Sequence, residues 1–203
     1  MQNNKKTDEN KPLHVLHVFG RLNRGGAESR VMDLYRNVDR TRIQFDFMQH
    51  TTKVCDFQTE IEQLGGKVYH VPPFRFWNYF SYCKAWKQFI KEHPEIRIVH
   101  GHMTSTASIY LPIVRKKGVF TIAHSRNAGV DKGIKGKLTK FLRRNLKEKC
   151  DRCFACSKLA GEAVFGKKAM EQGRVTIIPN AIDAARFTFD PEAVSYTHLT
   201  LPT

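Results

Sequence analysis

Residues 14–28 read HVLHVFGRLNRGGAE, and this stretch decides the fold. Val, Leu and Phe dominate 14–20, as in a strand that is buried on both faces of a parallel sheet. Gly25 and Gly26 follow, directly before a segment whose apolar residues recur at helical spacing. A buried strand, a glycine-rich turn and an amphipathic helix form the first unit of a sheet built from alternating strands and helices.

The same alternation continues along the chain. Six further short runs are strand candidates, namely 43–49, 67–71, 97–102, 119–125, 152–157 and 175–180. The segments of helical period are 27–38, 56–64, 79–93, 104–117, 137–149 and 157–165. Because parallel strands need long crossovers, this order predicts an α/β fold with a doubly wound, Rossmann-like parallel sheet and helices on both faces.

Length and composition limit the function classes. The 203 residues, 41% of them hydrophobic, suffice for one domain core. The longest apolar run, 107–114, is shorter than the roughly 20 residues that cross a membrane. The five cysteines, an odd number, fit a reducing compartment. The net charge of +15 favours anionic partners: nucleic acid, anionic lipid or phosphorylated small molecules.

The composition divides the chain into three parts. Residues 1–11 are polar, lack the features of a signal peptide, and are expected to form a disordered arm. Residues 12–190 carry the strand and helix pattern and are predicted to form one domain. Residues 191–203 depart from the pattern, and we interpret them as a truncated or non-native tail.

The first glycine loop differs from two nucleotide-binding patterns. Gly20 and Gly25 fit G-x-x-x-x-G-K-[ST], but Gly26 replaces the lysine and Ala27 replaces the hydroxyl residue. The loop also lacks the spacing of G-x-G-x-x-G. A free-standing Rossmann-type dinucleotide-binding domain stays open as an alternative, as does a turn that serves packing only. Glycines at a helix start can also bind an anion through unpaired amides.

Five short motifs follow one another along the chain. They are Gly25-Gly-Ala-Glu28, His100-Gly-His102, His124-Ser-Arg-Asn127, Ala155-Cys-Ser-Lys158 and Pro179-Asn-Ala-Ile-Asp183. Together, in this order and spacing, they resemble the amino-terminal half of family 4 glycosyltransferases, the retaining enzymes of GT-B fold, and within these the bacterial exopolysaccharide type. The similarity extends from about Leu13 to Phe187.

The resemblance implies an activity. A hexosyl-type sugar would pass from a nucleotide-sugar donor to a glycan or polyprenyl-diphosphate-linked acceptor, with retention and without a metal or other cofactor. In such enzymes the amino-terminal domain mainly receives the acceptor. The motifs of the nucleotide-holding second domain are missing from these 203 residues. We therefore expect one half of a GT-B two-domain architecture, inactive by itself.

The resemblance also assigns residues on the donor side. Gly25, Gly26 and Glu28 would form the loop that faces the donor diphosphate, with Glu28 helping to fix the helix start. Amides there would offset charge that grows on the leaving phosphate. His124 matches the histidine beside the transferred sugar and is the predicted catalytic residue.

A second set of residues is expected to line the acceptor pocket, namely His102, Arg126 and Asn127. Arg126 stands where relatives often carry a second histidine. This departure favours an acceptor with anionic character.

Two groups of residues suggest a metal site, but none is predicted. Cys150, Cys153 and Cys156 form C-x-x-C-x-x-C, yet the last two would face opposite sides of a strand and no fourth ligand follows. Buried small side chains are the preferred interpretation. His100 and His102 share a strand face without an accompanying carboxylate, so acceptor binding or plain hydrogen bonding is favoured.

Much of the positive charge lies in residues 131–149, which carry eight Lys or Arg against two acids. Its apolar stripe would pack inward, leaving either a solvated basic face or a surface for anionic lipid. The predicted membrane contacts are Lys137, Lys140, Arg143, Arg144 and Lys147. The aromatic run 74–80 suits membrane insertion or an acceptor channel. No nucleic-acid module is visible, so nucleic acid is not an expected partner. The basic segment and a lipid-linked acceptor together predict a cytoplasmic protein that is peripheral on the inner face of the cell membrane.

Overall fold

A computed structural model describes residues 11–129 and 133–181 of the chain. Its strands are β1 (Leu13–Phe19), β2 (Ile43–Gln49), β3 (Val68–His70), β4 (Ile96–Gly101), β5 (Phe120–Ser125), β6 (Arg152–Ala155) and β7 (Val175–Ile177). They form one parallel sheet in the order β3-β2-β1-β4-β5-β6-β7. The doubly wound, Rossmann-like sheet is therefore confirmed, and the strand order reverses between β1 and β4, where such sheets bind ligands.

The helices alternate with the strands, as the sequence pattern predicts. They are α1 (Gly26–Asn37), α2 (Gln58–Gln63), α3 (Tyr79–Glu92), α4 (Thr104–Arg115), α5 (Gly133–Arg143), α6 (Lys158–Phe165) and α7 (Lys167–Glu171), with 3-10 turns η1 (Phe76–Asn78) and η2 (Leu146–Glu148). None of these helices in the described part combines the length and apolar character that crossing a membrane requires.

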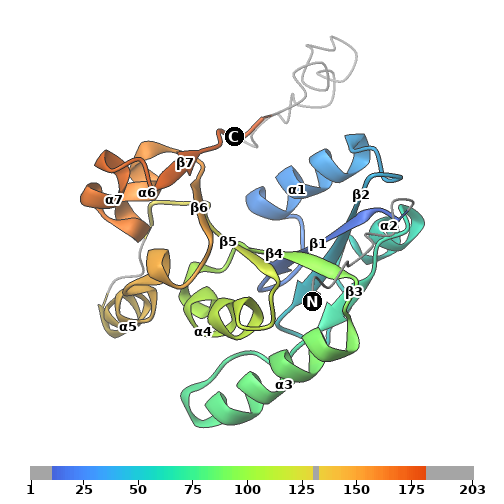
Figure 1. Cartoon of the computed structure of the whole chain (residues 1–203), viewed down its shortest axis with the longest axis horizontal. Helices are drawn as coiled ribbons and strands as arrows, with labels where there is room; N and C mark the ends of the chain where they lie inside the picture. The colour runs from blue at the N-terminus through green and yellow to red at the C-terminus, as the bar shows by residue number, and fades with distance from the viewer. Residues whose placement is uncertain (1–10, 130–132, 182–203) are drawn as a thin grey trace, which may run out of the picture.

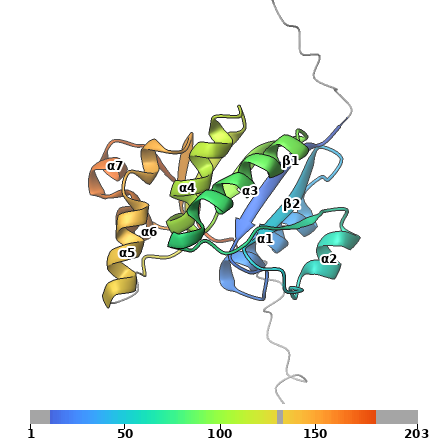
Figure 2. The same cartoon turned by 90° about the horizontal axis from the view of Figure 1, so that it is seen from below.

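Alternate residues of β1 enter two different cores, because successive side chains of a strand point to opposite faces. Leu16 packs with Trp86 of α3 and Tyr110 of α4, whose rings stack at 4.4 Å. Phe19 packs on the other face with Tyr35 of α1. Accordingly α1 covers one side of the sheet and α3 and α4 cover the other (Figure 1). Seen from below, α3, α4 and α5 lie together on this second side (Figure 2).

The helix predicted at 137–149 is partly wrong. The structure instead has α5 up to Arg143, and Asn145 then adopts a left-handed conformation at φ 59° before η2 begins. A left-handed residue just past a helix end terminates the helix, and asparagine tolerates this conformation better than most residues. Since α5 also begins earlier, at Gly133, the basic segment is a helix, a sharp turn and a short 3-10 turn rather than one helix.

Two smaller differences lie next to β6. The strand ends at Ala155 rather than at 157, because the Ser157 hydroxyl accepts a hydrogen bond from the Ala160 amide and begins α6. The sequence reading also missed α7, which follows Gly166 at φ 87°. The tail predicted at 191–203, most of the arm predicted at 1–11, and 182–190 of the predicted domain lie outside the described residues.

Candidate active site

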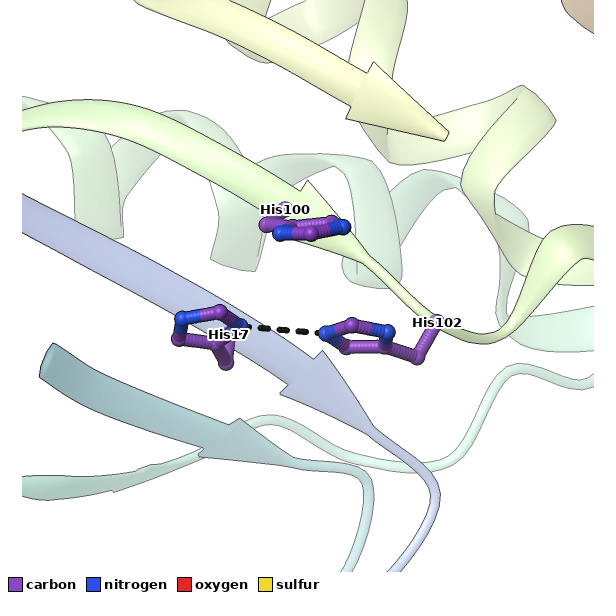
Figure 3. Close-up of side chains that lie close together, drawn as sticks. All are labelled: His17, His100 and His102. Carbon is purple, nitrogen blue, oxygen red and sulfur yellow. Dashed lines mark hydrogen bonds between the residues drawn. The ribbon is translucent and has the colours of Figure 1, made fainter. Parts of the chain in front are cut away.

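The carboxyl ends of β1, β4 and β5 bring four histidines together. His17 of β1 is the register partner of His100 of β4, His102 follows the end of β4, and His124 lies on β5. Their neighbouring ring centroids are 4.3–5.6 Å apart. Figure 3 shows three of these rings converging from β1 and the end of β4. We call these four residues the histidine cluster.

Arg126, just after β5, sets the hydrogen-bond direction through part of the cluster. Its Nε donates to Nδ1 of His102 at 3.1 Å, and a guanidinium cannot accept. His102 therefore carries its proton on Nε2 and donates to Nδ1 of His17 at 3.0 Å, the bond that is dashed in Figure 3. The Nε2 of His17 then holds a proton, is buried, and has no partner among the described residues.

The other two histidines form a pair of their own. Nε2 of His100 lies 3.0 Å from Nδ1 of His124, and the two rings stack at 5.2 Å. Nε2 of His124 is buried and has no partner in the part of the chain that the structure describes. Since buried polar atoms normally have partners, this nitrogen is an unsatisfied group beside the rest of the cluster.

Burial keeps the cluster uncharged. Desolvation, with a smaller contribution from the Arg126 charge, lowers the pKa of His124 to about 3, and the same causes together with the nearby His124 lower the pKa of His17 to about 3. The pKa values of His100 and His102 also lie well below the ordinary value because of burial and the neighbouring charges. Burial lowers the pKa of Arg126 to about 10, so Arg126 still carries its charge at pH 7.

A cavity of about 650 Å³ opens beside this cluster, at the switch between β1 and β4. Residues predicted separately for the diphosphate loop and for the acceptor pocket line it together, and they are Gly26, Glu28, His102, Arg126 and Asn127. Parallel strands carry the residues that follow them to one edge of the sheet, which explains why these distant motifs meet. Gly25 and His124 are not among the lining residues, although the ring of His124 contacts that of His102.

The glycine loop presents the start of α1 to this cavity. Gly25 is the extended N-cap residue at φ −84°, and a Cβ on it would collide with the carboxylate of Glu28. A Cβ on Gly26 would meet nothing within 4 Å, so the space in front of Gly26 is open. Burial raises the pKa of Glu28, the acidic residue in the first turn of α1.

Three residues of this region received no site role from the sequence, although Asn180 belongs to one of the five motifs. His17 completes the cluster, Arg30 lines the cavity and donates to the Ala181 carbonyl at 3.0 Å, and Asn180 lines the cavity and accepts from Arg126 at 3.4 Å. A histidine inside an apolar strand is a weak signal. Only the register between β1 and β4 brings His17 to the site.

The family of the chain follows from a match to one family model. The model of Glycosyltransferase Family 4 matches residues 24–186, which include the glycine loop, the end of β4 and the end of β5. The chain belongs to glycosyltransferase family 4. The resemblance inferred from the motifs is therefore confirmed.

Relatives of the chain include two glycosyltransferases of this kind. EpsF of Bacillus subtilis (strain 168), named as a glycosyltransferase, is 35% identical over 184 residues, 88% of this chain and 48% of EpsF. CapH of Staphylococcus aureus, named as a capsular polysaccharide biosynthesis glycosyltransferase, is 30% identical over 91 residues, 45% of this chain and 24% of CapH. The chain spans about half the length of EpsF.

Solved structures share the fold of this family 4 chain. Anabaena HepE in complex with UDP-glucose has a TM-score of 0.64 at 14% identity, covering 90% of this chain and 48% of HepE. MurG of Acinetobacter baumannii has a TM-score of 0.57 at 12% identity, covering 85% and 46%. At such identities the likeness shows the fold: this Rossmann-like unit corresponds to about half of the length of each of these proteins.

The three histidines of Figure 3 do not form a favourable metal site. Their ligand atoms lie within 4.8 Å of one another, a spacing that a metal ion accepts. However, the Arg126 hydrogen bond leaves a proton, not a lone pair, on Nε2 of His102, and the guanidinium adds a positive charge. The cluster therefore suits neutral and anionic groups better than a cation.

The predicted membrane residues fall on different surfaces. Only Arg144 of the five lines a groove of about 990 Å³ between α3, α4 and the end of α5, whereas Lys147 borders a smaller hollow. Lys137 and Lys140 are exposed on α5, and Arg143 is half-buried. Phe141, which was expected to pack inward, is 67% exposed and lines the groove.

Proposed function

We propose that this chain is the acceptor-side domain of a retaining hexosyl-type glycosyltransferase that uses a nucleotide-sugar donor and needs no metal or other cofactor. The observation that carries the proposal is the cavity at the switch between β1 and β4, where Gly26, His102, Arg126 and Asn127 meet. Membership of glycosyltransferase family 4 and the similarity to EpsF and CapH support a role in exopolysaccharide or capsule synthesis.

The donor diphosphate would lie at the start of α1. The open space in front of Gly26 lets phosphate oxygens approach the free amides, and the positive end of the helix stabilises charge that develops on the leaving group. Gly25 would let the loop pass close to the Glu28 carboxylate, and Glu28 would stabilise the first turn of α1. The UDP-glucose complex of HepE, which shares this fold, supports a nucleotide-sugar donor.

His124 would touch the transferred sugar. Because its pKa is about 3, it is neutral at pH 7 and acts as a hydrogen-bonding group rather than a cation. Its unpartnered Nε2 offers one hydrogen bond to a sugar hydroxyl, and His100 holds the opposite side of the ring. A fixed neutral imidazole positions the sugar without attracting the diphosphate.

The acceptor would carry an anionic group near Arg126. Its guanidinium donates hydrogen bonds to His102 and Asn180, which are both neutral. Among the described residues, the carboxylate that lines the cavity is that of Glu28, which interacts with the guanidinium charge. A phosphate or carboxylate on the acceptor would form charge-assisted hydrogen bonds with it. A polyprenyl-diphosphate-linked glycan meets this requirement, and Asn127 would contribute a neutral contact.

The groove between α3, α4 and α5 supports a position at the inner face of the cell membrane. Apolar side chains of Tyr79, Phe80, Ile113, Phe141 and Leu142 line it. Its cations are Lys84, Lys87, Lys116, Lys117, Arg144 and Lys149, and among the described residues no carboxylate lines it. We call this surface the basic groove. Phe80 is 86% exposed and Trp77 is 80% exposed, so aromatic side chains stand ready to enter a lipid interface.

One transfer assay tests the catalytic proposal. The chain alone and a longer protein, in which the second half of EpsF follows this chain, are supplied with UDP-sugars and a lipid-linked glycan. Turnover with retained anomeric configuration is expected from the longer protein, and little or none from the chain alone, because the relatives are about twice as long. Efficient transfer by the chain alone, or inversion, contradicts the proposal. Tight binding of a nicotinamide dinucleotide would favour the free-standing Rossmann alternative.

A binding assay tests the membrane position. The chain is mixed with phosphatidylglycerol vesicles and with single-stranded DNA across a salt series. We expect retention on vesicles at moderate salt and weak binding to DNA. Tighter retention on DNA than on vesicles contradicts the membrane position. The salt dependence of binding reports how many phosphate contacts the chain makes.

A further inference from the structure

Two cysteines meet at the edge of the sheet opposite the candidate active site. Cys150 lies in the bend that follows η2, and Cys153 lies on β6. Their Sγ atoms are 3.6 Å apart, although the sequence reading treated the C-x-x-C-x-x-C run as separate buried side chains. A disulfide needs about 2 Å between the sulfurs, so the two sulfurs must move closer together to bond.

A hollow of about 280 Å³ opens onto this pair, whose residues are 5% and 4% exposed. Besides the two cysteines it is lined by Arg115, Lys147, Glu148, Asp151, Arg152 and Arg174. Each of the two carboxylates already has a partner, in ion pairs of 2.8 Å to Arg115 and 2.7 Å to Arg174. The cations that line the hollow outnumber the carboxylates four to two, which favours a thiolate over a thiol.

The two sulfurs have different characters. The hydrogen bond between the two thiols, in which either sulfur can be the donor, and the charge of Arg174 lower the pKa of Cys153 against the opposing effect of burial. The same hydrogen bond and burial raise the pKa of Cys150. Cys153 is therefore suited to attack an oxidant, and Cys150 is suited to remain a thiol until it reacts in a second step.

We propose that Cys150 and Cys153 are a modification site, a dithiol that a hydroperoxide converts into an intramolecular disulfide. The Cys153 thiolate attacks the peroxide, so that an S–O bond forms, the O–O bond breaks, and the departing oxygen takes up a proton. Cys150 then loses its proton and its sulfur attacks Cys153, which breaks the S–O bond and releases water. Two thiols and one hydroperoxide ROOH give one disulfide, one ROH and one water, which for hydrogen peroxide means two molecules of water.

Two of the other three cysteines are matched controls. Cys156 lies at the far end of β6, where its thiol donates to the Arg126 carbonyl at 3.1 Å. Cys83 is buried on α3, away from this hollow. Neither lies in the charged hollow, so neither should react as fast as Cys153.

Peptide mapping tests the pairing in the unmodified chain. Trypsin cuts after Lys149, Arg152 and Lys158, which separates Cys150 from Cys153. After hydrogen peroxide and blocking of remaining thiols, peptide 150–152 should be joined to peptide 153–158, with the bond broken by dithiothreitol. A bond within 153–158, sulfinic acid on Cys153 alone, or two freely blocked thiols would overturn the proposal.

Single variants sharpen the result. Cys156→Ser and Cys83→Ser should still give the linked peptides, whereas Cys150→Ser and Cys153→Ser should lose them completely. In Cys150→Ser, blocking of the stalled sulfenic acid on Cys153 by dimedone is expected, and dimedone on Cys83 instead would contradict the proposed order of attack. If the linked peptides are lost in Cys156→Ser, the bond joins Cys150 to Cys156, and the proposal is wrong.

Discussion

The histidine cluster and the basic groove hold positive charge in opposite ways. In the first, one guanidinium, Arg126, stands beside four histidines that burial keeps neutral. In the second, several cations surround an apolar floor in contact with solvent. A buried single charge is oriented and selects one ligand group, whereas exposed charges attract any anionic surface and are screened by salt. The net charge of +15 therefore includes at least two kinds of site, one buried and oriented cation and a group of exposed cations.

The largest effect is expected from the oriented charge. Arg126→Ala in the longer protein with the second half of EpsF should lower kcat/KM about 100-fold to 1,000-fold, the usual loss when one positioned donor is removed. His124→Ala should have a comparable effect. The measurement is transfer from UDP-sugar, with Lys168→Ala, exposed on α7, as a control that keeps full turnover. Equal losses in all three variants would abolish the distinction between the two regions.

The neutral histidines should make stability depend on pH. Since the folded pKa of His17 is about 3, below the ordinary 6.5, the unfolded chain binds more protons between these values. Stability is fully present above pH 6.5 and falls as the pH drops, by about 1.4 kcal/mol per unit for each such histidine.

Urea unfolding between pH 7 and 5 measures this slope. His17→Phe should lower it by about one histidine's share. A slope that His17→Phe does not alter would mean that His17 is not held neutral by burial.

The basic groove should respond to charge reversal without any change in turnover chemistry. Lys116→Glu with Lys117→Glu should weaken binding to phosphatidylglycerol vesicles by at least about tenfold, since each cation near the surface contributes about 1 kcal/mol. The matched pair Lys167→Glu and Lys168→Glu, exposed on α7, should have little effect. Sedimentation with vesicles measures both, and equal losses would indicate attraction by net charge alone.

The smallest effect concerns the turn that ends α5 beside the groove. Asn145 is left-handed, so Asn145→Ala should cost about 1 kcal/mol of unfolding free energy, whereas Asn145→Gly should be close to neutral. Urea unfolding of both variants measures the difference. A stable Asn145→Ala chain would mean that 137–149 can form the continuous helix that its periodicity predicts.

The sequence predicted some parts of the site and missed others for physical reasons. His102, Arg126 and Asn127 follow strands of a parallel sheet, so the pattern alone sends them to one edge. His17 lies inside β1, and only its register with His100 brings it to the cluster. The sequence also could not predict that the sulfurs of Cys150 and Cys153 lie 3.6 Å apart, because this distance depends on the bend between η2 and β6.

What the sequence determined by itself is the alternation of strands and helices, because the spacing of apolar residues is a local property of the chain. The glycine loop and the motifs after the strands are short, local stretches of sequence, and they were enough to predict the family. Tertiary structure alone decided which histidines are buried, how Arg126 orients their protons, and where exposed cations border an apolar groove. Burial and register depend on residues far apart in the chain, and they set the pKa values and contacts on which the proposed chemistry rests.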